Sequence, residues 1–138
     1  MADTPEFQVE LRFPSDSAES QRVQHRLVEE LARHRFSEKV IFGIKLAIEE
    51  ALVNAIKHGN QLDPDKQVRF AYSVDDQRLT IEIEDQGPGF TPEDVPDPTA
   101  PENLERPCGR GLLLMRAYMT DCQFLPPGNV CRMTRVRE

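Results

Sequence analysis

The order in which hydrophobic periodicity changes along the chain limits its fold more than any other feature. Apolar and polar residues alternate over 7–13, 67–74 and 78–85, which is the period of half-buried strands. Between the first two runs, apolar residues recur at helical spacing over 17–36 and 38–59. The order of one strand, two helices and two strands is not a βαβ alternation, so it disfavours a doubly wound parallel sheet.

The two helical segments carry their own start and stop signals. Asp16 and Glu19 have the spacing of a capping box, and the first helix is predicted to end near Phe36. Ser37 is predicted to cap the second helix, and Gly59 is predicted to end it. These signals support the helical reading of both segments.

The second half of the chain begins with its least periodic part. Residues 87–109 are rich in proline and glycine and predict a long connection, with a lid at about 91–108. A third helix is expected over 111–119, and a closing hairpin joins 122–125 to 130–137. The predicted fold is α+β, a single domain over 1–138. It is a two-layer sandwich whose mixed or antiparallel sheet is covered on one face by about three helices.

Composition narrows the class of partner and the compartment. The 24 acidic and 17 basic residues give a formal charge of −7, which argues against direct binding to nucleic acid or to an anionic membrane. No apolar run approaches the roughly 20 residues that cross a bilayer, and the first residues lack a secretory pattern, so a cytoplasmic protein is expected. The spacing of Cys108, Cys122 and Cys131 favours reduced thiols over a metal or disulfide framework.

The segment EEALVNAIKHGN, residues 49–60, places a carboxylate and an amide one helical turn apart. Glu50 and Asn54 share a face at the border of the apolar stripe, so they can converge on one object. A carboxylate at such a border is costly to desolvate unless it has a partner. The alternative is a solvated surface pair of Glu50 with Lys45 or Lys57.

The segment DQGPGF, residues 85–90, follows directly on an alternating strand. Asp85 offers an acceptor at the strand end, while Gly87 and Gly89 remove side chains that would block a flat ligand. That pattern suits adenine, whose exocyclic amine can donate to the carboxylate. The alternative is an ordinary Gly-Pro turn.

The segment CGRGLLLM, residues 108–115, opens the third predicted helix with Gly109 and Gly111. Backbone amides at a glycine-rich helix start attract anions, and phosphate is the natural occupant. The segment lacks the lysine of a P-loop and does not follow the first strand of a βαβ unit. The alternative is a helix that merely begins at glycine.

Together the three segments resemble the ATPase superfamily of gyrase, heat-shock chaperones, histidine kinases and mismatch-repair ATPases. In that resemblance, residues 49–60 are the N box, 85–90 the first G box and 109–112 the second G box. The sequences of the segments EEALVNAIKHGN and LERPCGRGLLLM are most similar to those of the bacterial anti-sigma factor serine/threonine kinases. A sensor histidine kinase is less favoured, because no dimerisation and phosphoacceptor helix pair precedes these motifs.

The resemblance implies a role for each matching residue. Glu50 would be the general base, and Asn54 would ligate Mg²⁺ through its amide oxygen. Asp85 would read adenine, with Gly87 and Gly89 clearing its path. Further nucleotide contacts would come from Lys57, His58, Arg106, Gly109, Arg110, Gly111 and Leu112.

The resemblance also implies an activity and its partners. We expect an ATP- and Mg²⁺-dependent protein serine kinase that is also an anti-sigma factor and a homodimer. It would sequester a sigma factor and phosphorylate a serine of an antagonist protein. The alternatives are an ATP-binding module that sequesters a partner without phosphoryl transfer, and a structural protein with ordinary glycine turns. One departure is Asn129, where the family often has threonine, which puts a hydroxyl contact near the nucleotide in doubt.

Overall fold

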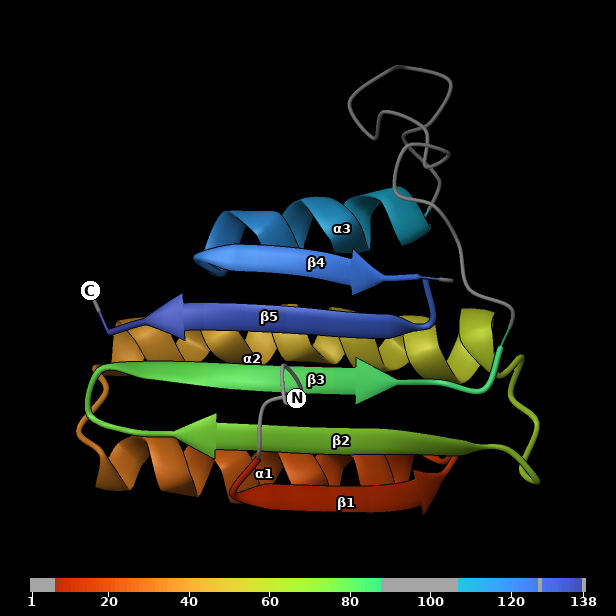
Figure 1. Ribbon diagram of the computed structural model, residues 1–138, viewed down its shortest axis with the longest axis horizontal. Coiled ribbons are helices and arrows are strands. Elements are labelled where there is room, and N and C mark those ends of the chain that lie inside the picture. Colours follow the sequence, from red (N-terminus) through yellow and green to blue (C-terminus); the bar gives the residue numbers. More distant parts are fainter. Residues whose placement is uncertain (1–6, 88–106, 127, 138) are drawn as a thin grey trace, which may run out of the picture.

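The computed structural model describes residues 7–87, 107–126 and 128–137, with the backbone alone for 107–112 (Figure 1). Residues 91–106 of the predicted lid therefore lie outside the described residues. The elements are β1 (Val9–Pro14), α1 (Ser17–Arg33), α2 (Glu38–Val53), η1 (Asn54–Gly59), β2 (Gln67–Val74), β3 (Arg78–Glu84), α3 (Pro107–Tyr118), β4 (Asp121–Leu125) and β5 (Val130–Val136).

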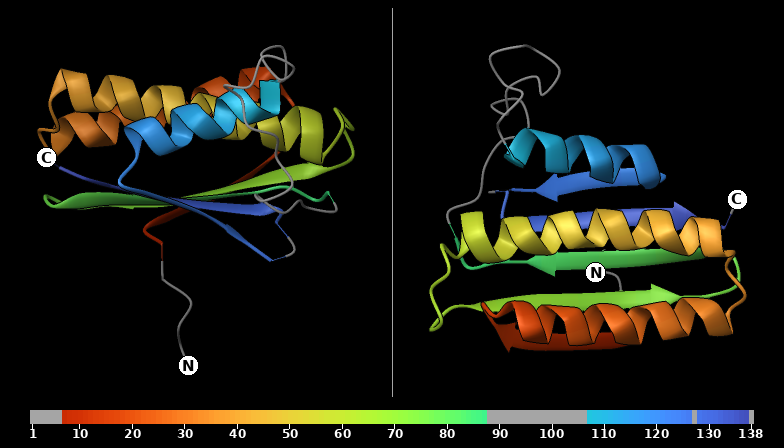
Figure 2. Two further views of the ribbon diagram at one scale, coloured as in Figure 1. Left: turned by 90° about the horizontal axis from the view of Figure 1, so that it is seen from above. Right: turned by 180° about the vertical axis from the view of Figure 1, so that it is seen from behind.

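The strands form one five-stranded sheet in the order β1-β2-β3-β5-β4. Every neighbouring pair in it is antiparallel. The helices lie together on one face of the sheet (Figure 2). The predicted α+β two-layer sandwich is therefore confirmed, and of the two sheet types allowed by the sequence the antiparallel one is found. After α3 the chain forms β4 at the edge, and β5 then returns between β4 and β3.

The core lies between the sheet and the helices. Most of the alternating strand residues that face the helices are buried, as are Ile44, Ile48, Ala51 and Leu52 of α2. Burial of each such side chain contributes roughly 1.5–3 kcal/mol. Within the described ranges, no helix is long and apolar enough to cross a membrane. Fully buried core residues include Leu27, Leu31, Ile44, Leu52, Val68, Phe70, Leu79, Ile81, Met115 and Met133.

A glycine sets the distance between α2 and α3. A Cβ atom on Gly43 would lie 2.8 Å from Cδ1 of Tyr118, at the end of α3. The start of α2 thus meets the end of α3, so the two helices run antiparallel and the start of α3 faces the end of α2.

Side-chain caps begin both long helices, as predicted. Asp16 Oδ1 accepts a hydrogen bond of 2.7 Å from the amide of Ala18. Ser37 Oγ accepts one of 3.2 Å from the amide of Val40. Each cap satisfies one of the four amides that a helix start leaves without an intrahelical partner.

Two details of α1 differ from the prediction. Glu19 does not complete a capping box but pairs with Arg22 at 3.1 Å. The helix ends at Arg33 rather than near Phe36, because Arg35 has a φ of 62°. This left-handed conformation closes the last turn as a C-terminal cap and is usually supplied by glycine.

The helix-free face of the sheet carries a row of ion pairs. Glu82 on β3 is only 5% exposed. It accepts hydrogen bonds from Arg69 of β2 at 3.1 Å and from Arg132 of β5 at 2.7 Å. Arg69 also contacts Glu10 of β1 at 3.4 Å, so charges of alternating sign cross four strands.

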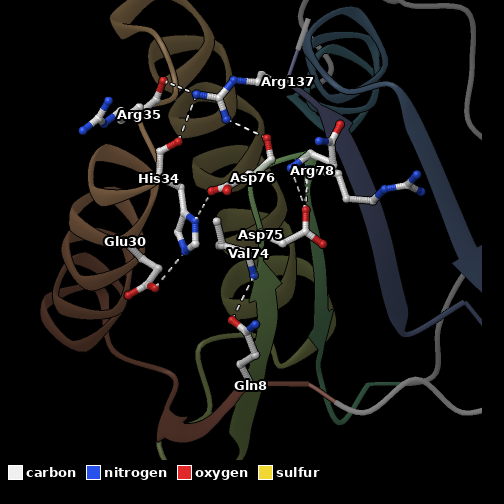
Figure 3. A network of polar contacts seen from close by, with 10 residues as sticks. Gln8, Glu30, His34, Arg35, Val74, Asp75, Asp76, Arg78 and Arg137 are labelled. Carbon is white, nitrogen blue, oxygen red and sulfur yellow. Dashed lines mark hydrogen bonds and ion pairs between the residues drawn. The ribbon is translucent and has the colours of Figure 1, made fainter.

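A polar network connects the end of α1 with the turn between β2 and β3 and with Arg137, which follows β5 (Figure 3). His34 Nδ1 lies 2.9 Å from Asp76 Oδ1, and its Nε2 lies 3.4 Å from Glu30. The guanidinium of Arg137 donates to the main-chain carbonyls of His34, Arg35 and Asp76. The hydrogen bond to Asp76 is the main reason that the pKa of His34 is raised above its ordinary value.

This network predicts a pH dependence of stability. A raised folded-state pKa means that the contribution of His34 is complete below the unfolded histidine pKa of about 6.5. It is lost as pH rises through the folded pKa. Asp76→Asn should flatten the fall in thermal midpoint between about pH 6 and 8, and His34→Gln should flatten it further. Thermal denaturation across that range measures the effect.

The matched control for this prediction is His25→Gln. His25 lies on the same helix with a side chain 78% exposed and contacts Glu29 only at 3.7 Å. The control should keep the pH profile of the wild type. An Asp76→Asn profile that coincides with the wild-type profile would contradict the assignment.

Candidate functional site

The end of the predicted N box and the start of the first G box are in direct contact. A Cβ atom on Gly59 would lie 2.2 Å from Cγ of Asp85. A Cβ atom on Gly87 would lie 2.2 Å from the carbonyl oxygen of Gly59. Such approaches require the absence of side chains at both glycines. The two segments therefore form one unit at the end of β3.

The carboxylate of Asp85 is half-buried within this unit. Its Oδ1 accepts a hydrogen bond of 2.7 Å from the amide of Gly87. Burial raises the pKa of Asp85 above its ordinary value, and the Gly87 hydrogen bond opposes that shift. The described residues supply no hydrogen bond to Oδ2. Among the described residues, one oxygen is thus held by a hydrogen bond and the other is not.

A methyl group added at Gly59 and one added at Gly87 are expected to lower the free energy of unfolding by different amounts. In Gly59→Ala the new Cβ meets the Asp85 carboxylate and forces this side chain out of its position, which costs less than moving the backbone. In Gly87→Ala it meets the backbone of Gly59, which cannot yield without moving η1. We expect Gly87→Ala to lower the free energy of unfolding by about 2 kcal/mol or more and Gly59→Ala by about 1 kcal/mol. Urea denaturation of both variants measures this, and equal losses would contradict it.

A π-helix supplies the end of the N-box segment. The sequence predicts one continuous α-helix to Gly59, but the α-helical pattern stops at Val53 and η1 begins at Asn54. The amide of Asn60 accordingly donates to the carbonyl of Ala55, five residues earlier, at 2.8 Å. Short π-helical turns often occur at functional sites. Here the turn begins at the residue predicted to bind the metal.

Glu50 precedes this turn by four residues, and both Glu50 and Asn54 are half-buried. Among the described residues, Glu50 makes no ion pair. The surface-pair alternative with Lys45 or Lys57 is therefore not supported. Lys57 and His58 are exposed on η1.

The second G box lies in the first turns of α3. The helix begins at Pro107, a favoured first helical residue, so Gly109 and Gly111 lie inside the helix rather than before it. Because α3 runs antiparallel to α2, its start faces the end of the N-box segment (Figure 2). Arg110 and Leu112 belong to the same backbone segment. Gly89 and Arg106 lie outside the described residues.

Asn60 is a site residue to which the sequence assigned no role. Its side chain is fully buried. Oδ1 accepts a hydrogen bond of 2.7 Å from the amide of Gln86. Nδ2 donates to Ser15 Oγ and to the carbonyl of Gln67, each at 3.0 Å. Its position as the last residue of the N box is the sequence signal that accompanies this role.

Asn129 contacts the main chain of Asp85 from the other side. Its Nδ2 donates to the Asp85 carbonyl at 3.0 Å, and its own carbonyl accepts from the Asp85 amide at 3.0 Å. Gly128, with a φ of 106°, forms the preceding turn. Asn129, which stands where the family often has threonine, therefore contacts Asp85 through its side-chain amide.

The chain matches the family model of the histidine kinase-like ATPase domain over residues 13–135. It is 30% identical over 98 residues to a serine-protein kinase RsbW of Oceanobacillus iheyensis, an alignment that covers 67% of this chain and 62% of that protein. It is 37% identical over 89 residues to an anti-sigma F factor of Clostridium perfringens, covering 62% of this chain and 63% of that protein. The chain thus spans less than two thirds of these curated relatives.

A solved structure shares the fold. The RsbU and RsbW domains of a protein from Mycobacterium tuberculosis match with a TM-score of 0.62. The match covers 95% of this chain and 32% of that chain at 18% sequence identity. At that identity the likeness supports the fold alone.

Proposed function

The chain belongs to the histidine kinase-like ATPase domain family, and on that premise we propose that it is an ATP-dependent protein serine kinase and anti-sigma factor. It sequesters a sigma factor and phosphorylates a serine of an antagonist protein. The observation that carries the proposal is the contact of Gly59 with the Asp85 carboxylate, which joins the N box and the first G box into one unit. The names of two relatives, a serine-protein kinase and an anti-sigma F factor, support the proposed substrate class and partner.

The residues present fit a nucleotide at this unit. No described residue donates a hydrogen bond to Asp85 Oδ2, which could therefore accept from the exocyclic amine of adenine. The start of α3 directs backbone amides toward the same end of the molecule, where phosphate would be favoured.

The residues also fit Mg²⁺ as a partner of phosphate. Within the described part of the chain, no cluster of three or more histidine, cysteine, aspartate or glutamate residues could hold a metal ion on its own. Mg²⁺ is typically held by one or two protein oxygens together with substrate phosphates. Asn54 would supply the protein oxygen. When bound, the ion would neutralise charge on the phosphates.

The chain's own residues divide the chemistry between them. Glu50 accepts the proton of the attacking serine hydroxyl, a role supported by its half-buried position and by the lack of an ion pair with any described residue. Asp85 orients the base by accepting from its amine. The remaining proposed nucleotide contacts are Lys57, His58, Gly87, Gly89, Arg106, Gly109, Arg110, Gly111 and Leu112.

We place the protein in the cytoplasm as a homodimer that binds the sigma factor in one nucleotide state and the antagonist in another. Such switching requires a difference in affinity between the two states. The anti-sigma name of the Clostridium relative supports the sigma factor as partner.

Two measurements test the function. Isothermal titration with Mg²⁺-ATP should give saturable binding, and γ-labelled ATP should label a serine of the antagonist protein purified from the same host. Omission of Mg²⁺ should abolish transfer. Binding without transfer would favour the non-catalytic module, and absence of binding would overturn both.

A further inference from the structure

The two residues that follow β3, Asp85 and Gln86, are held by side-chain amides from two distant parts of the chain. Asn129 makes two hydrogen bonds to the main chain of Asp85, each 3.0 Å long. Its side-chain Nδ2 donates to the Asp85 carbonyl, and its main-chain carbonyl accepts from the Asp85 amide. Both polar groups of the Asp85 main chain are thereby bound by a single residue. Neither contact touches the Asp85 carboxylate itself.

The next residue is held from the opposite side. The amide of Gln86 donates to Oδ1 of Asn60 at 2.7 Å. Asn60 is fully buried, and its two N–H groups bind Ser15 Oγ and the Gln67 carbonyl. This side chain therefore has one acceptor and two donors in use, so it is a rigid anchor for the peptide between Asp85 and Gln86.

The two anchors together determine where the carboxylate points. With its own carbonyl and the following amide fixed, Asp85 presents Oδ1 to the amide of Gly87 at 2.7 Å. The contact with Gly59 limits rotation on the other side. No described residue donates to Oδ2, which is therefore the oxygen that would accept from a ligand.

The orientation has a chemical consequence for the choice of base. A carboxylate oxygen accepts from the 6-amino group of adenine, but it opposes the 6-oxo group of hypoxanthine or guanine, which is also an acceptor. A fixed oxygen separates these bases better than one that can turn away, because a site built for one hydrogen bond leaves unpaired groups with the wrong ligand.

We propose that Asn129 is a positioning residue that fixes the Asp85 carboxylate and so sets the preference for a 6-amino over a 6-oxo purine nucleotide, with Asn60 as the opposite anchor. This inference rests on the proposed function, because it requires that Asp85 reads the base. Asn129 acts through Asp85 and takes the place of the expected threonine by donating its amide to the protein rather than to the nucleotide.

The test compares ADP with inosine diphosphate, which differ at the group that Asp85 reads. Isothermal titration gives the ratio of the two affinities for the wild type and for Asn129→Ala, which loses the Nδ2 donor but keeps the main-chain contact. We expect the ADP preference to fall by about tenfold in the variant, largely through weaker ADP binding. Asn129→Thr restores a hydroxyl donor and should give an intermediate ratio.

The matched control is Gln123→Ala, in the same hairpin. Its amide binds Asp121 Oδ2 at 2.9 Å and does not contact Asp85. The control should keep the wild-type ratio. Thermal midpoints of all variants are measured in parallel, because a purely structural role would lower the midpoint without changing the ratio.

The outcomes separate the inference from the function on which it rests. A wild type that prefers ADP, with an unchanged ratio in Asn129→Ala and Asn129→Thr, overturns the positioning role and leaves the function standing. A wild type that binds neither nucleotide removes both. If Asn129→Ala fails to fold, a ratio in Asn129→Thr equal to that of the wild type overturns the inference.

Discussion

Glu50→Gln is expected to bind Mg²⁺-ATP within about threefold of the wild type while phosphoryl transfer falls by about 100-fold or more. The amide has the shape of the carboxylate but cannot accept the serine proton. Glu50 makes no ion pair among the described residues, so the change leaves no described charge without its partner. Titration and transfer of labelled phosphate to the antagonist measure the two effects separately.

The neighbouring residue is a matched control for this variant. Glu49 accepts a hydrogen bond of 2.8 Å from Nε2 of Gln24 on α1. Its side chain therefore points toward α1 and not toward the proposed site. Glu49→Gln can keep that contact and should transfer phosphate at the wild-type rate. Equal loss of transfer in both variants would remove Glu50 from the role of base.

Asp85→Asn is expected to weaken ATP binding by about 100-fold or more without lowering stability at neutral pH. The amide can still accept from Gly87, but its nitrogen cannot accept from adenine. Burial raises the folded-state pKa of Asp85, so its contribution to stability is greatest below the unfolded pKa. That contribution is lost as pH rises through the folded pKa. Asparagine removes this loss, so the variant should be at least as stable as the wild type at neutral pH.

Asp75→Asn provides a control of opposite sign. Hydrogen bonds from the amides of Gln77 and Arg78 lower the pKa of Asp75, so its charged form stabilises the fold. This stabilisation is present above the unfolded pKa and is lost as pH falls through the folded pKa. Asp75→Asn should lower stability at neutral pH and leave nucleotide binding intact. Urea denaturation and titration of both variants decide the matter, and the same sign of stability change in both would contradict the assignment.

The fold was predictable from the sequence as far as local patterns extend. Periodicity placed the strands and helices, and Asp16 and Ser37 marked the helix starts, because these signals depend on residues a few positions apart. The order of β5 between β3 and β4 has no local signal. The partners of Glu82 were hidden for the same reason, since Arg69 and Arg132 lie on other strands.

The candidate site was predictable in its motifs and not in its packing. The motifs singled out Glu50, Asn54 and Asp85, and their roles remain proposals. The contact of Gly59 with Asp85 and the π-helical turn depend on how β3 meets the end of α2. No spacing within either segment encodes that meeting.

The place of β5 in the sheet has a consequence for the order of events during protein synthesis. Asp85 is held by Asn129, a residue 44 positions further along the chain. A nascent chain on the ribosome can form α1, α2 and the β2–β3 hairpin while the last hairpin is still in the exit tunnel. The carboxylate proposed to read the base then lacks one of its two anchors until Asn129 has left the ribosome.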